Sequence, residues 1–242
     1  MKKAMQLIAV LGLVAGVSSA VRADLVTNGG FETLTSGPGQ LGYNTNATGW
    51  TTSGYNFVFA SGTADTTGSN GLTLWGLHNG SANGLTASSP SGGNFVAADG
   101  AYGVGAISQT INGLTIGQSY TVGFDWAGAQ QYGYNSPTTE QWTVGFGSQT
   151  QSTVVLNNLN HGFTGWQHQT FAFTADGPSD VLSFLAVGTP SGEPPFSMLD
   201  GVTVTPTTPE GSSLALLVMG LGSIGFVARR GSRAAKSAKS GS

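Results

Sequence analysis

The sequence contains no cysteine, so no disulfide can support the fold, which must depend on its hydrophobic core. Charge is also scarce, with 8 lysine and arginine residues against 11 aspartate and glutamate residues in 242 positions. The basic residues all lie in the two ends of the chain, and residues 24–208 contain none. That region cannot bind nucleic acid or anionic lipid, because both interactions need cationic side chains.

Catalytic signatures are missing as well. The three histidines are scattered without zinc-ligand spacing, and no Gly-x-Ser-x-Gly turn indicates a serine nucleophile. Asp125 and Glu140 are the one acidic pair near aromatic residues in the middle of the chain, but their spacing does not mark a glycosidase pair. We therefore predict that the protein is not an enzyme.

Acidic residues dominate the middle of the chain, with ten between residues 24 and 208. Because no lysine or arginine is available there, a buried carboxylate must be satisfied by hydrogen bonds or by a metal ion. Hard divalent cations such as Ca²⁺ are the usual metal partners of carboxylate oxygens.

The N-terminus predicts a secretory signal peptide over residues 1–23. Lys2 and Lys3 precede an apolar run, and small or medium residues then suit cleavage by signal peptidase before Asp24. A retained membrane anchor is the less favoured alternative, because the run is short against the roughly 20 residues that span a bilayer.

A second apolar segment, residues 212–228, predicts a transmembrane helix of about 25 Å. Residues 229–242 are basic and should stay in the cytoplasm, so that residues 24–205 face outward. A buried core helix is the alternative, which the adjacent basic cluster disfavours. Between domain and helix, residues 206–211 form a short, extended Thr/Pro linker.

The order of features at this end resembles the PEP-CTERM sorting signal: Pro209 and Glu210, then a small-residue-rich apolar span, then Arg229 and Arg230. The chain departs from that pattern at Gly211, where the family has proline, and by continuing beyond the arginines. The resemblance implies an exosortase as a partner that removes the tail. It also implies a bacterium with two membranes and an association with exopolysaccharide and biofilm formation.

Residues 24–205 predict one all-β domain, because Gly-rich turns separate short alternating runs and no helical periodicity is visible. Such strands favour a β-sandwich or jelly roll. One run is predicted to be buried on both faces, residues 181–185. The half-buried strands are predicted at residues 120–126, 142–146, 171–173 and 198–205.

The opening LVTNGGFE, followed by Trp50, and the closing LDGVTV resemble galactose-binding-like jelly rolls and carbohydrate-binding modules. The resemblance implies that the first and last strands are neighbours. It also implies that Glu32 and Asp200 hold a structural Ca²⁺ together with backbone carbonyls. The alternative is two separate surface carboxylates.

Aromatic residues could stack against sugar rings. Tyr132 and Tyr134 lie in a polar loop and are predicted to be exposed ligand-binding residues, whereas Trp126 and Trp142 lie in alternating runs and are predicted to be core. The wider set of candidates includes Trp50, Tyr55, Trp75, Tyr102 and Trp166.

These features together predict an exported protein that is held briefly in the inner membrane and then reaches the cell surface or the extracellular matrix. Exopolysaccharide is its expected partner, bound by exposed aromatic residues. A purely structural acidic matrix protein without a specific ligand is the first alternative. A polysaccharide-degrading enzyme is the second and is disfavoured.

Overall fold

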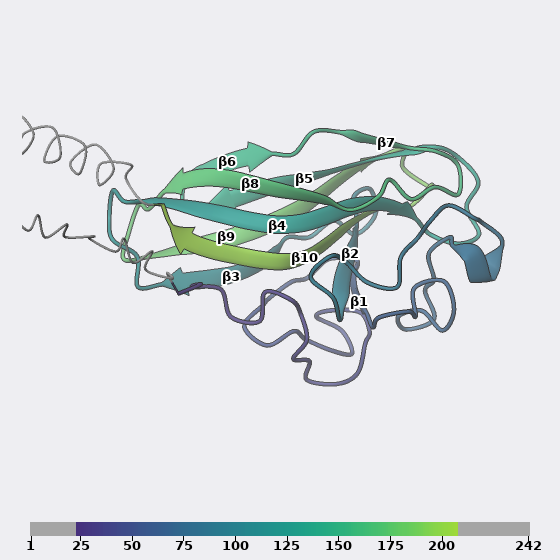
Figure 1. Cartoon of the computed structure of the whole chain (residues 1–242), viewed down its shortest axis with the longest axis horizontal. Helices are drawn as coiled ribbons and strands as arrows, with labels where there is room; N and C mark the ends of the chain where they lie inside the picture. Colours follow the sequence, from purple (N-terminus) through teal and green to yellow (C-terminus); the bar gives the residue numbers. More distant parts are fainter. Residues whose placement is uncertain (1–22, 208–242) are drawn as a thin grey trace, which may run out of the picture.

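The computed structural model of the chain describes residues 23–207 (Figure 1). The predicted transmembrane helix lies outside these residues, as do Pro209, Glu210, Arg229, Arg230 and nearly all of the predicted signal peptide. Between residues 23 and 207, no helix is long and apolar enough to cross a membrane.

Two antiparallel β-sheets face each other (Figure 1), which confirms the predicted β-sandwich. The first has the strand order β1-β2-β10-β4-β8, and the second has the order β3-β9-β5-β6 with β7 paired to β5. The first sheet comprises β1 (Asn56–Phe59), β2 (Phe95–Asp99), β10 (Pro195–Pro206), β4 (Ser119–Gln130) and β8 (Gln167–Thr174). The second comprises β3 (Ile107–Asn112), β9 (Ser179–Thr189), β5 (Thr138–Phe146), β6 (Gln149–Ser152) and β7 (Leu156–Asn158). A short 3₁₀ helix, η1 (Leu77–Asn79), lies between β1 and β2.

Alternating side chains of β4 and β5 build the core between the sheets. Trp126 and Trp142 are both buried, as predicted. Phe184 of β9 meets Phe124 edge to face at 5.1 Å and Trp142 at 6.0 Å between ring centroids. Edge-to-face geometry is favourable for aromatic pairs, so these rings both fill the space between the two sheets and fix the distance between them.

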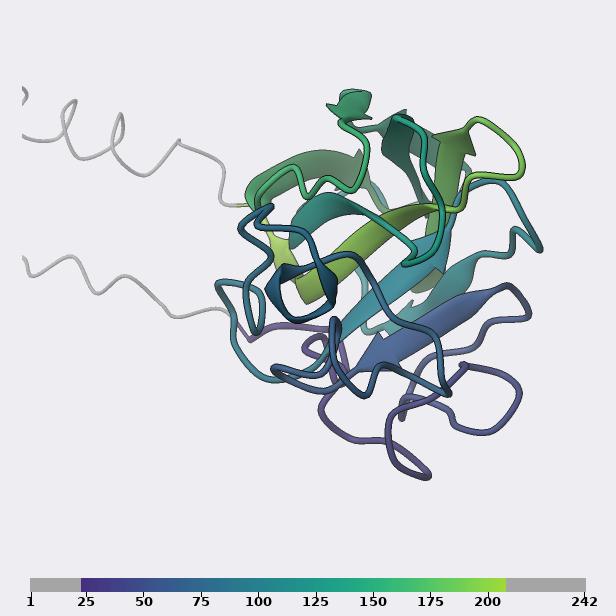
Figure 2. The ribbon, with the colours of Figure 1, turned by 90° about the vertical axis from the view of Figure 1, so that its right-hand side faces the viewer.

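A second apolar cluster lies on the outer face of the first sheet. The chain between β1 and β2 crosses this face and contributes Ala64, Leu72 and Leu74 (Figure 2). They pack against outward-facing residues of the sheet, among them Phe57, Phe95, Ala129 and Met198. This cover explains why nearly all of β4 is buried although its sequence alternates.

The prediction that residues 181–185 are buried on both faces is wrong. β9 alternates, with Leu182 and Phe184 buried and Val181 exposed to 50%. The physical reason is that the apolar cover lies over the first sheet, whereas β9 belongs to the second.

The first described residues lie beside the last strand. The Leu25 N–H donates to the Val204 carbonyl at 3.0 Å, and the Asp24 carboxylate accepts from the Val204 N–H at 2.8 Å. The chain therefore enters and leaves the sandwich at the same end, on the left of Figure 1.

Candidate functional sites

Two acidic residues face each other on the outer side of the first sheet. Asp200 of β10 is directly opposite Asp125 of β4 in the strand register. Like charges in this position repel, so each needs a local partner. The register shifts just after Asp200, which forms a β-bulge at Gly201. Glycine is required at this position because its φ is +58° and because an added side chain would collide with Ser91.

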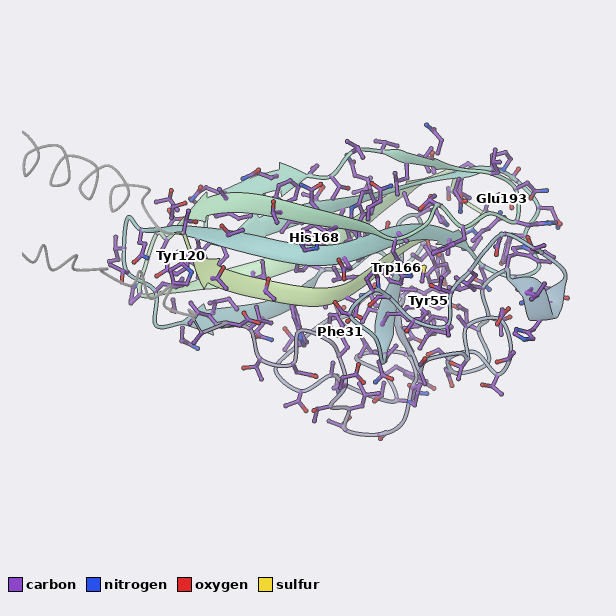
Figure 3. All side chains as sticks on the ribbon, viewed as in Figure 1. Phe31, Tyr55, Tyr120, Trp166, His168 and Glu193 are labelled. Atoms are coloured by element: carbon purple, nitrogen blue, oxygen red, sulfur yellow. The ribbon has the colours of Figure 1, made fainter. Side chains whose placement is uncertain are left out.

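Asp125 has its partners within the protein. Its Oδ2 accepts a hydrogen bond from the Ser91 hydroxyl at 2.8 Å, and its Oδ1 lies 2.9 Å from Nδ1 of His168. The His168 ring is mostly exposed on β8 (Figure 3). Asp125 is therefore stabilised by its neighbours without any added ligand.

Asp200 is only half satisfied. Its Oδ2 accepts from the Ser89 hydroxyl, but its Oδ1 is buried and meets no hydrogen-bond donor among residues 23–207. The pKa of Asp200 is raised to about 7: burial is the largest cause, the charges of Glu32 and Asp125 also raise it, and hydrogen bonds from Ser89 and Gly201 lower it. An unpaired carboxylate oxygen in such a place is costly unless a proton or a cation reaches it.

Glu32 is brought next to Asp200. The turn that begins at Asn28 has Phe31 at a φ of +56° and directs the chain toward β10 (Figure 3). A Cβ added to Gly30 would lie 3.7 Å from Asp200 Oδ1 and 3.8 Å from Glu32 Oε1. The two carboxylate oxygens therefore lie beside the same small space next to Gly30. We call Glu32, Asp125 and Asp200 the carboxylate site.

The donor set of the carboxylate site fits a hard cation. The free Oδ1 of Asp200 and the Glu32 carboxylate are oxygen ligands of the kind that Ca²⁺ prefers. No group of three or more Asp, Glu, His or Cys side chains with metal-binding geometry occurs in residues 23–207. A cation at this site would therefore need backbone carbonyls or water as its remaining ligands, which is common for Ca²⁺.

A cavity of about 270 Å³ opens where four strands of the first sheet begin or end. Tyr55 precedes β1, Asp99 ends β2, Gln131 follows β4 and Pro194 precedes β10. Antiparallel neighbours alternate in direction, so these chain ends meet at one edge. We call this the tyrosine cavity, lined by Tyr55, Asp99, Ala101, Tyr102, Gln131, Tyr134, Ser191, Gly192 and Pro194.

Tyrosine rings form its walls. The rings of Tyr55 and Tyr102 meet edge to face, with centroids 5.4 Å apart and an interplanar angle of 85°. Tyr102 is exposed to 67%, and Tyr134 is half-buried. Burial raises the pKa of the Tyr55 phenol, and the next cause is the charge of Asp99.

Two loops hold Tyr134 in place. The Asn135 N–H donates to Oε2 of Glu193 at 3.0 Å, which joins the loop after β4 to the loop before β10. The Trp75 indole N–H donates to the Tyr134 carbonyl at 2.9 Å. Glu193 marks this end of the molecule in Figure 3, opposite Tyr120.

Asp99 forms the polar wall of the tyrosine cavity. Its side chain is buried, and Oδ1 accepts from the N–H groups of Ala101 and Tyr102 at 2.8 Å and 3.0 Å. Its Oδ2 is buried and meets no donor in the described part of the chain. Burial raises the pKa of Asp99, and the two N–H groups oppose that effect.

The two tyrosines singled out from the sequence are placed differently. Tyr134 lines the cavity, whereas Tyr132 lies outside it and packs against Trp75 at 4.6 Å between ring centroids. Asp99 and Gln131 were not among the sequence candidates. No local signal marks them, because the cavity exists only once four separate segments have come together.

Asp125 and Glu140 are not a pair. Glu140 points inward from β5 toward Gly128 of β4, whereas Asp125 contacts Ser91 on the outer face of the same sheet. The sheet therefore separates the two carboxyl groups. Glu140 is fully buried, and burial raises its pKa to about 8, while a hydrogen bond from Thr138 opposes the shift.

The sequence matches no protein-family model and no curated protein. Among solved structures, the chain is similar to the carbohydrate-binding module TmCBM61 in complex with β-1,4-galactotriose, at 15% identity and a TM-score of 0.43 over 76% of this chain and 99% of that one. It is also similar to the CBM22-1 xylan-binding domain of Paenibacillus barcinonensis Xyn10C, at 11% identity and a TM-score of 0.41 over 78% and 97%. The arabinose-bound α-L-arabinofuranosidase MgGH51 matches at 14% identity and a TM-score of 0.43, over 78% of this chain and 27% of that one. At these identities and TM-scores, the ligands of those proteins cannot be assigned to this chain. A ligand must therefore be inferred from this chain's own residues.

Glu140 should make stability depend on pH. Its pKa is about 8 in the folded state against 4.5 as the ordinary value, so the folded protein retains a proton that the unfolded chain releases between these values. The free energy of unfolding should therefore fall as pH rises through this window. Glu140→Gln cannot ionise and should be more stable than wild type by on the order of 2 kcal/mol at about pH 9.

The measurement is urea unfolding of the purified full chain at several pH values, with chelator present throughout. Asp176→Asn is the control, because Asp176 is at the surface and its pKa is lowered mainly by hydrogen bonds from Ser148. This variant should keep the wild-type slope above about pH 5. An unchanged slope in Glu140→Gln would show that Glu140 is ionised in the folded protein.

Proposed function

We propose that this protein is an exported, non-catalytic, glycan-binding protein of the bacterial surface or extracellular matrix. The observation that carries the proposal is the tyrosine cavity, which combines aromatic walls with a buried carboxylate and a side-chain amide. Aromatic faces bury the apolar C–H surface of a sugar ring. Carboxylate and amide groups fix its hydroxyls by hydrogen bonds.

The position of the tyrosine cavity suits a tethered protein. The described chain ends at Thr207, at the end of the sandwich opposite the loops that line the cavity (Figure 1). The PEP-CTERM-like features beyond this point would attach the domain to the inner membrane, until exosortase removes the tail. In that arrangement the cavity points away from the membrane, toward exopolysaccharide.

We further propose that the carboxylate site holds a structural Ca²⁺ through Glu32 and Asp200, with carbonyl or water ligands. The buried, unpartnered Oδ1 of Asp200 supports this assignment. The cation would neutralise two carboxylates in a region that has no lysine or arginine to do so. Its role would be to stabilise the fold, since the carboxylate site and the tyrosine cavity share no residue.

Removing a tyrosine wall should weaken glycan binding. Tyr102→Ala and Tyr134→Ala should each lower affinity for the producing organism's exopolysaccharide about tenfold, because the stacked apolar surface contributes about 1–2 kcal/mol. Affinity electrophoresis of the full chain in detergent would measure the change.

Tyr43→Ala is the matched control for those variants, because Tyr43 is exposed to 78% and lies outside the cavity. Tyr132→Ala should also have little effect. Equal glycan affinity in all four variants would show that the tyrosine cavity is not the glycan-binding site. No binding by the wild type would instead favour a structural matrix protein without a specific ligand.

Calcium should stabilise the protein. Millimolar Ca²⁺ should raise the thermal unfolding midpoint by about 5–10 °C over chelator, as expected for a ligand that binds only the folded state. Asp200→Asn should abolish this response, whereas Asp176→Asn should retain it. Equal midpoints for the wild type in excess Ca²⁺ and in chelator would contradict the calcium site.

The sorting proposal concerns the ends of the mature protein. Intact mass of the protein recovered outside the producing cells should show loss of residues 1–23 and of the apolar segment 212–228 with all that follows. Replacing Pro209 and Glu210 by alanine should leave the full-length form in the membrane fraction, whereas Thr208→Ala should not. A secreted form that still ends at Ser242 would rule out processing.

A further inference from the structure

The tyrosine cavity contains no positive group. Residues 24–208 have ten acidic residues and no lysine or arginine, so histidine is the only side chain that could carry positive charge. His78 and His168 pair with Asp65 and Asp125, and His161 stacks on Trp75. None of the three lines the cavity. An anionic ligand such as a uronic acid or a sulfated sugar would therefore meet no opposite charge in the cavity and would be repelled by the Asp99 carboxylate.

One carboxylate oxygen of Asp99 lacks a hydrogen-bond donor in the described residues. Two backbone N–H groups satisfy Oδ1, but Oδ2 has no donor among residues 23–207 although it is fully buried. The side chain is exposed to only 1%, and the residue lines the cavity. A ligand in the cavity is thus the available source of a donor, and a charged donor would gain more than a hydroxyl, because charge-assisted hydrogen bonds are about twice as strong.

The tyrosines add a second preference for positive charge. Tyr55 and Tyr102 stand almost perpendicular to each other, and Tyr134 lies on the opposite loop. Aromatic faces attract cations through their quadrupole, and aromatic cages are a known means of binding ammonium groups. A metal ion is a poorer candidate, since Asp99 is the one acidic residue among those that line the cavity.

We propose that the tyrosine cavity recognises the protonated amino group of an amino sugar, with Asp99 as its counter-ion and the three tyrosines around it. The inference rests on the proposed glycan-binding function and narrows it to polysaccharides with unacetylated amino groups. Acetylation removes the charge and adds bulk, so an N-acetylated sugar loses both the ion pair and the cation–π contact.

A matched pair of trisaccharides tests the inference. One is glucosamine trisaccharide and the other is its fully N-acetylated counterpart, each titrated calorimetrically into the full chain in a detergent without a sugar headgroup. At about pH 6.5, below the usual pKa of amines, and about 0.15 M salt, the free-amine form should bind about tenfold to a hundredfold more tightly.

Asp99→Asn should remove this preference while keeping the hydrogen bonds that Oδ1 accepts. Asp176→Asn removes the same charge at an exposed position outside the cavity and should keep the preference. If the preference survives in Asp99→Asn, or falls equally in both variants, the attraction comes from the overall negative charge and the inference is wrong.

The outcomes separate the inference from the function on which it rests. Equal affinity for both trisaccharides in the wild type would overturn the amino-sugar inference and leave glycan binding intact. Ethanolamine serves as a third probe. If it binds in an Asp99-dependent manner while neither the trisaccharides nor the exopolysaccharide binds, the cation cage is correct and glycan binding is wrong. If none of the three probes binds, the amino-sugar inference is overturned, and glycan binding is overturned with it only if the exopolysaccharide also fails to bind.

Discussion

The constraint behind most of this structure is that a domain with ten carboxylates has no lysine or arginine to pair with them. Burying an ionised carboxylate costs several kcal/mol, and the usual remedy is a cationic neighbour. Here each buried acid must be satisfied by hydrogen bonds, by a proton or by something from outside the domain. The buried acids are informative for that reason, since each one shows which of these solutions its surroundings allow.

Asp125, Glu140 and Asp99 show the three solutions. Asp125 has a serine and a histidine as partners and needs nothing more. Glu140 is enclosed between the sheets, where its raised pKa keeps it protonated at neutral pH. Asp99 differs from Glu140 in that its unpartnered oxygen belongs to a residue that lines a cavity. Contact with a cavity, rather than burial alone, distinguishes Glu140, a protonated structural acid, from Asp99, the proposed binding group.

Alternation in the sequence was sufficient to predict the strands that contain Trp126 and Trp142, because period-two patterns report directly on which face is buried. The apolar run at residues 181–185 led to a wrong prediction of burial on both faces, because the apolar cover lies over the other sheet and is formed by the chain between β1 and β2, which has no periodic pattern of its own. The site residues likewise differ in whether the sequence could predict them. Glu32 and Asp200 came from a family resemblance, and Tyr134 came from its place in a polar loop. Asp99 could not be found, because Tyr55, Gln131 and Tyr134 on the other segments of the cavity are remote from it in sequence.

Strand β10 connects these features in space. Its 12 residues run from Pro195, next to the tyrosine cavity, to Pro206, where the described chain leaves the sandwich. At about 3.3 Å per residue this is about 40 Å, so the cavity lies far from the point where the described chain leaves the sandwich. Asp200 lies in the middle of that strand, directly before the bulge at Gly201. A cation at Asp200 would stabilise the bulge against repulsion from Asp125 and so preserve the register of β10 with β4. Since the residues that follow β4 and precede β10 both line the cavity, that register also sets how its walls face each other.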